Sequence, residues 1–445
     1  MLPVAIRAVR SPPLRFNIVY QFAEHETRYH QASLAWQPAS HCPRDRVSWL
    51  SGAIRLDGQE KRMLRSDQQK LKDDVDRHLA NGTTTMAKQE WLNPVAEYVD
   101  ADHLGLEIAN VLRRLPVIVA HTSELRDAGD FVTRNILDVP LLIVRGDDAT
   151  VRAFVNVCRH RGSAVVSESH GCARRFTCPY HAWSYSSDGT LVGIPNDDGF
   201  ENIDRSLYGL VELPCEDRHG FVWASLTADA TFDAAEFLGE LDEELGSWGL
   251  DCSTLVKSTR VVVDANWKLL IDGFLETYHV RFLHSVSVAP YIHSNLGVFN
   301  EYGRHGRMAN VRTRYEGENR PLDDDFLYGV GGVYVLFPNT VILWHGTHHE
   351  RYTFTPHPGN PGRTDCDIEL LAPAGSQDLT DKWERNWELV ISTITGEDFP
   401  MAISSQAGFA AGYPDHFVFG RNEPFVQHFH RQLKAELASA LTVEP

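Results

Sequence analysis

Hydrophobic and polar residues follow two different periods along this chain. Residues 67–80 and 99–114 carry apolar residues at helical spacing, and Asp67 and Asp100 are plausible N-terminal caps. From residue 116 onwards, short β-branched runs alternate with glycine, proline and paired aspartates, which is typical of antiparallel strands joined by turns. The pattern predicts N-terminal helices within 63–115 and an all-β domain over 116–226.

The C-terminal half combines helical and strand-like patterns. Residues 227–255 are acidic with helical spacing, and the stretch 285–330 is rich in loop-forming residues. The strands expected after it are 330–339, 340–357 and 363–373, and the helices expected are 378–394, the segment GEDFPMAISSQAGFA, and 424–442. An antiparallel sheet flanked by long helices is an α+β architecture, which we expect for a C-terminal domain over 227–445.

Residues 1–62 differ from the rest because they are comparatively basic, with no acidic residue before Glu24. This composition weakly resembles a leader peptide. The alternative, which we favour, is a start assigned too early, with Met63 as the working initiator. In either case we expect 1–62 to be a poorly packed extension without a catalytic role.

Composition narrows the function classes. The formal net charge is −18, which argues against a nucleic-acid partner, and no run of eighteen apolar residues predicts a membrane span. Of the seven cysteines, only Cys158 and Cys178 stand in a motif. The scattered spacing of the others is typical of a reducing compartment, so we expect a cytoplasmic protein.

The motif Cys158-Arg-His160 followed by Cys178-Pro-Tyr-His181 offers two thiolates and two imidazoles to a metal centre. A structural zinc site usually has two to four residues between paired ligands, so the first pair fits zinc poorly. A disulfide between the two cysteines would leave both histidines unexplained. A Rieske [2Fe–2S] centre uses this ligand set, with two thiolates on one iron and two imidazoles on the other.

The flanking segments VRAFVNVCRHRG and FTCPYHAWSYSSDGTLVGIPN resemble the cluster-binding loops of Rieske-type ring-hydroxylating oxygenases. The resemblance extends over roughly 63–430. It implies that Cys158 and Cys178 hold the buried iron of the cluster and that His160 and His181 hold the outer iron. Since such a cluster accepts an electron and passes it on, the chain should contain a second centre that uses the electron.

The segment from Asp272 to His284 is the expected second centre. A mononuclear non-haem iron that activates O₂ uses two histidines and one carboxylate and keeps positions open. His279 and His284 would lie about 140° apart on a regular helix, so we expect the helix to kink or end near Phe282. Asp272, Glu276 and His279 are predicted to share one helix face.

The family resemblance supplies the third ligand, because the pattern of His279 and His284 is followed in that family by a distant aspartate in a helix. Asp398 occupies this position, in Glu397-Asp398 followed by Gln406-Ala-Gly408, and Glu397 is the rival ligand. The resemblance therefore implies a mononuclear Fe(II) held by His279, His284 and Asp398.

Two further acids are candidate catalytic residues. By the resemblance, Glu276 would hydrogen-bond His279 in its own chain and His181 across a subunit contact, where most of the family has Asp. Glu also occurs there in the branch acting on quaternary ammonium compounds such as carnitine and glycine betaine. Asp272 is either a second acid of the pocket or a plain helix-face residue.

His345, His348 and His349 have no partner carboxylate at a telling spacing, so they are predicted to be structural or pocket-lining.

The resemblance implies the terminal oxygenase component of a multi-component system, assembled as a homotrimer and acting on O₂ and a small organic substrate. No Gly-x-Gly-x-x-Gly fingerprint is present, so electrons should come from a separate ferredoxin or flavin reductase. An aromatic substrate is slightly favoured, because Thr277 stands where the ammonium branch usually has Cys. The alternative substrate is a quaternary ammonium compound, which would bind in an aromatic cage. The aromatic residues available for such a cage are Tyr278, Phe282, Tyr291, Trp344 and Tyr352.

The sequence also leaves open two functions from other classes of protein. The first is an electron-transfer Rieske protein without catalysis, which would need neither the second centre nor the long C-terminal domain. The second is a zinc-stabilised binding domain.

Overall fold

The computed structural model describes residues 47–50, 53–56, 63, 65–315, 324–376 and 379–442. The chain divides into the units Met1–Ser40 and His41–Pro445, and every element below belongs to the second. The prediction of a poorly packed segment over 1–62 falls outside the described residues, apart from the antiparallel pair β1 (Val47–Leu50) and β2 (Ala53–Leu56).

The predicted N-terminal helices are present with altered boundaries. Helix α1 (Arg65–Asn81) begins two residues before the expected cap Asp67 and ends before Gly82, whose φ of 59° suits a helix stop. The second predicted helix begins as α3 (Ala101–Glu107), and Asp100 is confirmed as its N-cap, because its carboxylate accepts from the backbone N–H groups of Asp102 and His103. A separate short helix, α2 (Ala96–Val99), precedes it. The π-helical turn η1 (Ile108–Leu112) extends α3.

An all-β domain follows over the predicted range, in three small antiparallel sheets with strand orders β12-β7-β6-β5-β8, β13-β14-β4 and β11-β10-β9. The strands are β4 (Val117–His121), β5 (Asp130–Ile136), β6 (Val139–Arg145), β7 (Val151–Val155), β8 (His170–Cys172), β9 (Arg175–Thr177), β10 (Ser184–Ser186), β11 (Leu191–Gly193), β12 (Glu212–Leu213), β13 (Cys215–Arg218) and β14 (Phe221–Ala224). The short helical turns are η2 (Thr122–Glu124), η3 (Asp197–Phe200) and η4 (Arg205–Tyr208).

The C-terminal domain is built on one seven-stranded antiparallel sheet of order β15-β21-β20-β19-β18-β17-β16. Its strands are β15 (Ser253–Val263), β16 (Ile292–Tyr302), β17 (His305–Arg312), β18 (Val330–Leu336), β19 (Thr340–Trp344), β20 (His349–His357) and β21 (Asn360–Pro373). The prediction of a loop-rich stretch over 285–330 is wrong, since β16 and β17 lie there. The glycine and asparagine residues of these strands are typical of loops, so the sequence did not indicate the pair. Its register shifts between Ile292 and Gly297.

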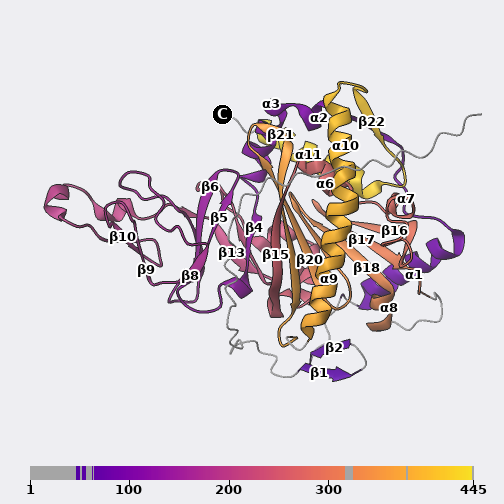
Figure 1. The fold of residues 1–445 in the computed structure, drawn as a ribbon, viewed down its shortest axis with the longest axis horizontal. Helices are drawn as coiled ribbons and strands as arrows, with labels where there is room; N and C mark the ends of the chain where they lie inside the picture. Colours follow the sequence, from indigo (N-terminus) through magenta and orange to yellow (C-terminus); the bar gives the residue numbers. More distant parts are fainter. Residues whose placement is uncertain are drawn as a thin grey trace, which may run out of the picture. The chain divides into compact units, whose positions relative to one another are not determined.

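Helices and turns complete this α+β domain: α4 (Ala234–Leu238), α5 (Leu241–Ser247), η5 (Leu250–Cys252), α6 (Trp267–Asp272), α7 (Val280–Leu283), α8 (Asp324–Gly329), α9 (Thr380–Thr393), η8 (Ile394–Asp398), α10 (Phe399–Ala410) and α11 (Pro424–Thr442). Strand β22 (His416–Phe419) pairs with β3 (Trp91–Pro94). The expected start of α9 at Asp378 lies outside the described residues. Figure 1 shows α9 and α10 running one after the other along the large sheet.

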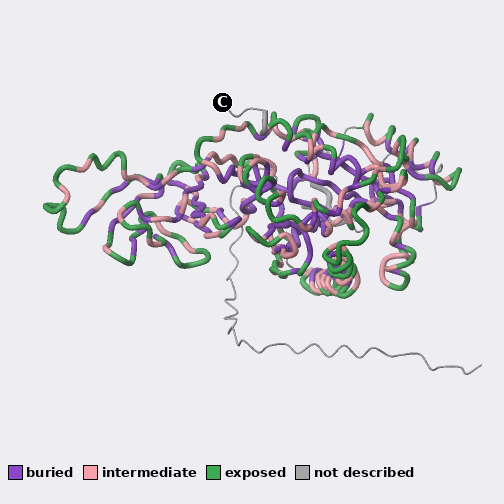
Figure 2. Tube along the Cα trace, turned by 90° about the horizontal axis from the view of Figure 1, so that it is seen from above, coloured by how far each residue is buried: buried purple, intermediate pink, exposed green. Residues whose placement is uncertain are grey.

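Apolar side chains of both domains form the core. Buried residues follow the strands, whereas exposed residues gather on the outer turns and on the outward side of the helices (Figure 2). Trp383 of α9 packs against Leu370 and Ala372 of β21, which fixes α9 on the sheet. Within the described parts of the chain, no helix is both long and apolar enough to cross a membrane.

A buried ion pair joins the N-terminal helices to the C-terminal domain. The Lys268 ammonium of α6 donates to Glu107 of α3 at 2.6 Å, and both side chains are fully buried. The Trp267 indole donates to the second Glu107 oxygen at 2.9 Å. Burial opposes ionisation, but Lys268 and His103 hold the pKa of Glu107 below its ordinary value. The pair fixes the start of α6, the helix that leads into the predicted iron segment.

Lys268→Met should lower the free energy of unfolding by about 3 kcal/mol or more, because it leaves the Glu107 carboxylate buried without its cation. The measurement is the urea midpoint of the protein. The control is Lys268→Met combined with Glu107→Gln, which removes the stranded charge and retains an acceptor for Trp267. It should lose less stability than the single variant, and an unchanged midpoint for Lys268→Met would contradict this role.

Candidate metal centres

The two cysteine–histidine loops have matching backbone geometry. In each loop the cysteine carbonyl accepts from the N–H four residues later, and the cysteine N–H donates to the carbonyl five residues later. The position four residues after the cysteine has positive φ in both, with 78° at Gly162 and 57° at Ala182. The chain therefore presents Cys158 and Cys178 from equivalent tight turns, as two halves of one site require.

The side chains of these loops converge. Cys158 and Cys178 are buried free thiols, so neither forms the disulfide considered from the sequence. The rings of His160 and His181 lie 4.6 Å apart between centroids, and His160 stacks on Trp183 at 4.9 Å. Nδ1 of His160 is buried without a hydrogen-bond partner. Two thiols, two imidazoles and an orphaned ring nitrogen fit a Rieske cluster.

Tyr185 contributes a polar contact to this site. Its hydroxyl accepts from the backbone N–H of Arg159 at 3.0 Å and lies 3.4 Å from the Cys158 sulfur, so its own hydrogen is available to that sulfur. Burial and the neighbouring Cys158 raise the pKa of Tyr185 above its ordinary value, which keeps it a donor. Hydrogen bonds to ligand sulfurs are among the factors that set the potential of an iron–sulfur cluster.

The structure brings together the three residues expected at the second centre. Nε2 of His284 lies 3.0 Å, and Nε2 of His279 3.8 Å, from Oδ1 of Asp398. The two imidazole rings are 5.0 Å apart between centroids. Two imidazoles and one carboxylate converging in this way match the ligand set of non-haem Fe(II).

Local backbone structure explains how residues 279 and 284 share one site. His279 is the residue before α7 and His284 the residue after it, so the four-residue helix ends between the expected kink and the second ligand. The predicted shared helix face of Asp272, Glu276 and His279 is wrong, because α6 ends at Asp272 and irregular backbone follows. Asp398 closes the π-helical turn η8, a widened turn of the kind often found at functional sites.

Glu397, the rival ligand, takes a different position. Its Oε2 lies 2.7 Å from Nδ1 of His284 and accepts from the Ser287 hydroxyl at 2.7 Å. Nδ1 of His284 is thereby engaged, which aims Nε2 at Asp398. Burial opposes the charged imidazole, but Asp398 and Glu397 raise the pKa of His284 above its ordinary value. The two adjacent acids thus contact opposite ring nitrogens of His284, with Glu397 at Nδ1 and Asp398 at Nε2.

Glu276 holds His279 in a similar way. Its carboxylate contacts Nδ1 of His279 and accepts from the backbone N–H of Tyr278 and, at 3.1 Å, from that of His279. The part of the prediction that links Glu276 to His279 therefore agrees with the structure. The contact with His181 across a subunit boundary remains a prediction.

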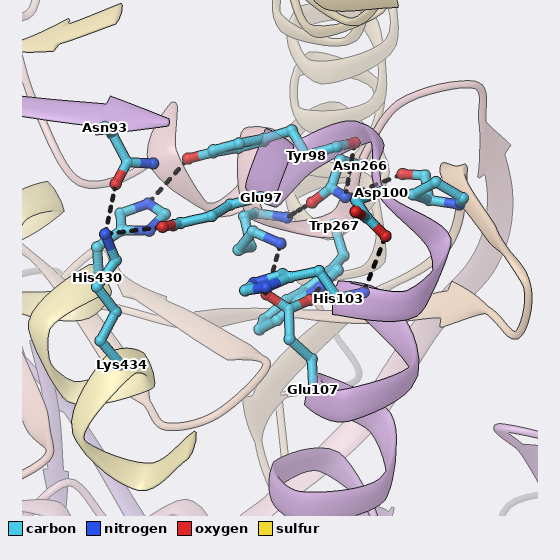
Figure 3. Close-up of polar contacts among 12 residues, drawn as sticks. Asn93, Glu97, Tyr98, Asp100, His103, Glu107, Asn266, Trp267, His430 and Lys434 are labelled. Carbon is cyan, nitrogen blue, oxygen red and sulfur yellow. Dashed lines mark hydrogen bonds and ion pairs between the residues drawn. The ribbon is translucent and has the colours of Figure 1, made fainter. Parts of the chain in front are cut away.

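Asp272 is engaged away from the triad. The Tyr98 hydroxyl donates to Asp272 at 2.8 Å, and Nε2 of His430 lies 2.9 Å from its other oxygen. Tyr98 and His430 also contact each other at 3.0 Å (Figure 3). Gln406 donates to the Tyr98 carbonyl, so part of the expected Gln-x-Gly segment fastens this region to α10. Asp272 is thus the anchor of a buried polar network at the end of α6.

The five aromatic residues considered for a cage do not gather at one place, although the rings of Tyr278 and Phe282 contact each other at 6.0 Å between centroids. Tyr278, Phe282 and Tyr291 are 52%, 62% and 65% exposed. Trp344 and Tyr352 are buried in separate core clusters. The described residues therefore contain no cage built from these five.

Sequence reasoning missed Glu350. The structure places it beside His345 and His348, so these histidines do have a partner carboxylate, contrary to the prediction. The available signal was the spacing His348-x-Glu350 at the start of a strand, which puts both residues on one face.

Comparison with known proteins identifies the domains. Residues 116–204 match the Rieske [2Fe-2S] domain, and residues 250–439 match the ring hydroxylating alpha subunit (catalytic domain). The chain therefore contains a Rieske domain followed by a ring-hydroxylating alpha-subunit catalytic domain. These domains imply a Rieske cluster and a mononuclear iron, and the donor sets described above fit both.

Curated relatives include the carnitine monooxygenase oxygenase subunit of Escherichia coli (strain K12), 34% identical over 228 residues, which are 48% of this chain and 60% of that protein. The glycine betaine monooxygenase oxygenase subunit of Chromohalobacter salexigens is 35% identical over 191 residues, 43% of this chain and 42% of that protein. The large oxygenase component of a Ralstonia naphthalene 1,2-dioxygenase system is 33% identical over 192 residues, 41% of this chain and 42% of that protein. The matches thus span about half the length of these relatives.

Solved structures share the fold. A quaternary ammonium Rieske monooxygenase studied for carnitine oxidation and inter-subunit electron transfer aligns with a TM-score of 0.68 at 22% identity, covering 81% of this chain and 96% of that chain. Naphthalene 1,2-dioxygenase from Rhodococcus sp. aligns with a TM-score of 0.64 at 20% identity, covering 86% and 99%.

Glu397→Ala should weaken iron binding at the triad about 10- to 100-fold, because His284 loses the group that orients it. Iron content after dialysis against a weak chelator measures this, while the visible absorbance of the cluster should not change. Ser287→Ala is the matched control, since it removes a contact of Glu397 but keeps the contact with His284. Wild-type iron retention in Glu397→Ala would contradict the orienting role.

Proposed function

We propose that this chain is the terminal oxygenase component of a multi-component Rieske system. The observation that carries the proposal is the presence, in one chain, of a two-thiol, two-imidazole site and a triad of two imidazoles and a carboxylate. An electron carrier needs only the first site. A zinc-stabilised binding domain would have no use for Tyr185 beside a ligand sulfur, or for a second triad with oriented imidazoles.

The residues have distinct tasks in this proposal. Cys158, Cys178, His160 and His181 would hold the cluster, and His279, His284 and Asp398 would hold the iron. When bound, the cluster supplies electrons one at a time and the iron supplies the chemistry that activates O₂. Glu397 and Glu276 keep the two imidazoles aimed at the metal position, and so keep the remaining positions open.

A homotrimer would place the two centres of different subunits in contact. His181 is partly exposed, and its neighbour Tyr180 is 55% exposed. Tyr278 and Phe282, which flank His279, are exposed too. Apolar surface beside both centres suits burial at a subunit contact. The Glu276 carboxylate keeps acceptor capacity for His181 of the partner subunit and would join the two centres.

Electrons would come from a separate ferredoxin or flavin reductase, because the sequence holds no dinucleotide fingerprint. The net charge of −18 favours a donor with a basic docking face.

For the substrate, we propose a quaternary ammonium compound, since relatives named for carnitine and glycine betaine match this chain and Glu276 is the residue that the resemblance associates with that branch. The preference for an aromatic substrate has less support and remains the second candidate. A naphthalene dioxygenase component also matches, and the five expected cage residues do not converge. Substrate-dependent oxygen uptake with a trimethylammonium compound, against an aromatic hydrocarbon, separates the two.

His284→Ala tests the oxygenase assignment. It removes a triad ligand at a distance from the cluster loops in sequence, so it should abolish substrate-dependent oxygen uptake and leave the cluster absorbance intact. Oxygen uptake at the wild-type rate would sink the proposal.

Glu276→Gln tests the link between the centres. Glutamine keeps the length of the side chain and an amide oxygen that can still accept from Nδ1 of His279, so both metals should stay bound. It loses the negative charge between the two centres, so turnover should fall at least about tenfold. The readout is the rate at which substrate and O₂ reoxidise the reduced cluster. Reoxidation at the wild-type rate would exclude the bridging role.

A further inference from the structure

The turn between β19 and β20 gathers a second set of metal-ligating side chains. Trp344 and His349 pair across the two strands, and His345 donates its backbone N–H to the His348 carbonyl at 3.1 Å within the turn. Gly346 has a φ of 84°, and a Cβ there would meet the Tyr328 ring at 2.6 Å, so the turn has one conformation that glycine permits. The backbone thus holds its side chains in fixed directions.

Three of those side chains converge on one point. Nε2 of His345 lies 3.0 Å, and Nε2 of His348 3.6 Å, from Oε1 of Glu350. Their ligand atoms all lie within 4.8 Å of one another. His349 points elsewhere, with its ring against Trp248. Two donor atoms that each lie about 2.1 Å from one metal are roughly 3.0–3.4 Å apart in octahedral or tetrahedral geometry. The separations from the Glu350 oxygen, 3.0 Å and 3.6 Å, are close to that range.

The arrangement repeats the geometry of the iron triad. The corresponding separations there are 3.0 Å from His284 and 3.8 Å from His279 to the Asp398 oxygen. Both sets consist of two Nε2 atoms and one carboxylate oxygen, and they share no residue.

Hydrogen bonding leaves the converging atoms available. Nε2 of His345 is buried and makes no hydrogen bond, although the Glu350 oxygen is only 3.0 Å away, so the two atoms are not aligned as donor and acceptor. The Thr347 hydroxyl engages Nδ1 of His348 at 3.1 Å, and the Tyr352 hydroxyl donates to the other Glu350 oxygen at 2.7 Å. Such contacts to the far atoms of ligands are what orient metal sites.

The charges also favour a cation. Glu350 is 4% exposed, and a buried carboxylate needs a compensating charge. The side chain of His345 is 32% exposed although its Nε2 is buried, so the three ligand atoms lie close below the protein surface.

We propose that His345, His348 and Glu350 form a second metal site, for a divalent transition cation such as Zn²⁺. Two imidazoles and one carboxylate are a ligand set that zinc takes with a further position left for water. The His348 ring lies 5.6 Å from that of Trp383 on α9, so the proposed site lies against the helix that leads to Asp398. The site is independent of the oxygenase proposal.

Zinc binding to the cluster-loaded protein tests the proposal, with ZnCl₂ alone as the probe. Equilibrium dialysis followed by elemental analysis should find this site filled both in the wild type and in His284→Ala, in which the iron triad is broken. His345→Asn should raise the Kd at least about tenfold. This residue lies on a partly exposed turn, so the variant should fold, and an unchanged cluster absorbance verifies it.

His357→Asn is the matched control, because His357 lies on β20 with Glu350 and contacts a carboxylate, Asp365, outside the triad. It should bind zinc as the wild type does. Failure of His284→Ala to bind zinc would overturn the proposal, and so would an unchanged zinc Kd in both His345→Asn and Glu350→Gln.

Discussion

The catalytic domain depends on fixing both nitrogens of each imidazole that faces the metal position. A histidine side chain can rotate, so convergence of three ligand atoms requires a partner on the opposite ring nitrogen. Glu397 is that partner for His284, and Glu276 for His279. Because Glu397 and Asp398 are adjacent on the π-helical turn η8, that one turn positions both the group that orients His284 and the proposed third ligand. A shift of α9 along the sheet would therefore displace both at once.

This constraint explains why the surrounding helices are anchored by several buried contacts. Trp383 fastens α9 to β21, and the buried Lys268–Glu107 pair fastens the start of α6. Asp272 then holds the end of α6 through Tyr98 and His430. The irregular backbone between α6 and α7 lies between fixed ends, which allows His279 and His284 to flank a helix of only four residues. In the Rieske domain, two equivalent tight turns position the cysteine and histidine side chains instead.

Much of this organisation could be predicted from the sequence, because the motifs that carry chemistry are local. The two cysteine–histidine pairs, the end of the helix before His284, and the cap at Asp100 were all readable from spacing. The predictions that were wrong concern features that are non-local or that depend on irregular backbone. The β16–β17 pair was hidden by glycine and asparagine, and the fate of Asp272 depended on Tyr98 and His430, far away in the chain. Glu350 was missed because its partner His345 approaches only through a turn.

The central claim is that one chain holds both a Rieske cluster and a separate mononuclear iron. Iron and acid-labile sulfide counts on anaerobically purified protein, with electron paramagnetic resonance of the dithionite-reduced sample, test it most directly. The protein should contain about three irons and about two sulfides per chain and give a Rieske-type signal. A colourless protein, or one with about two irons, two sulfides and no additional iron under any loading condition, would contradict it.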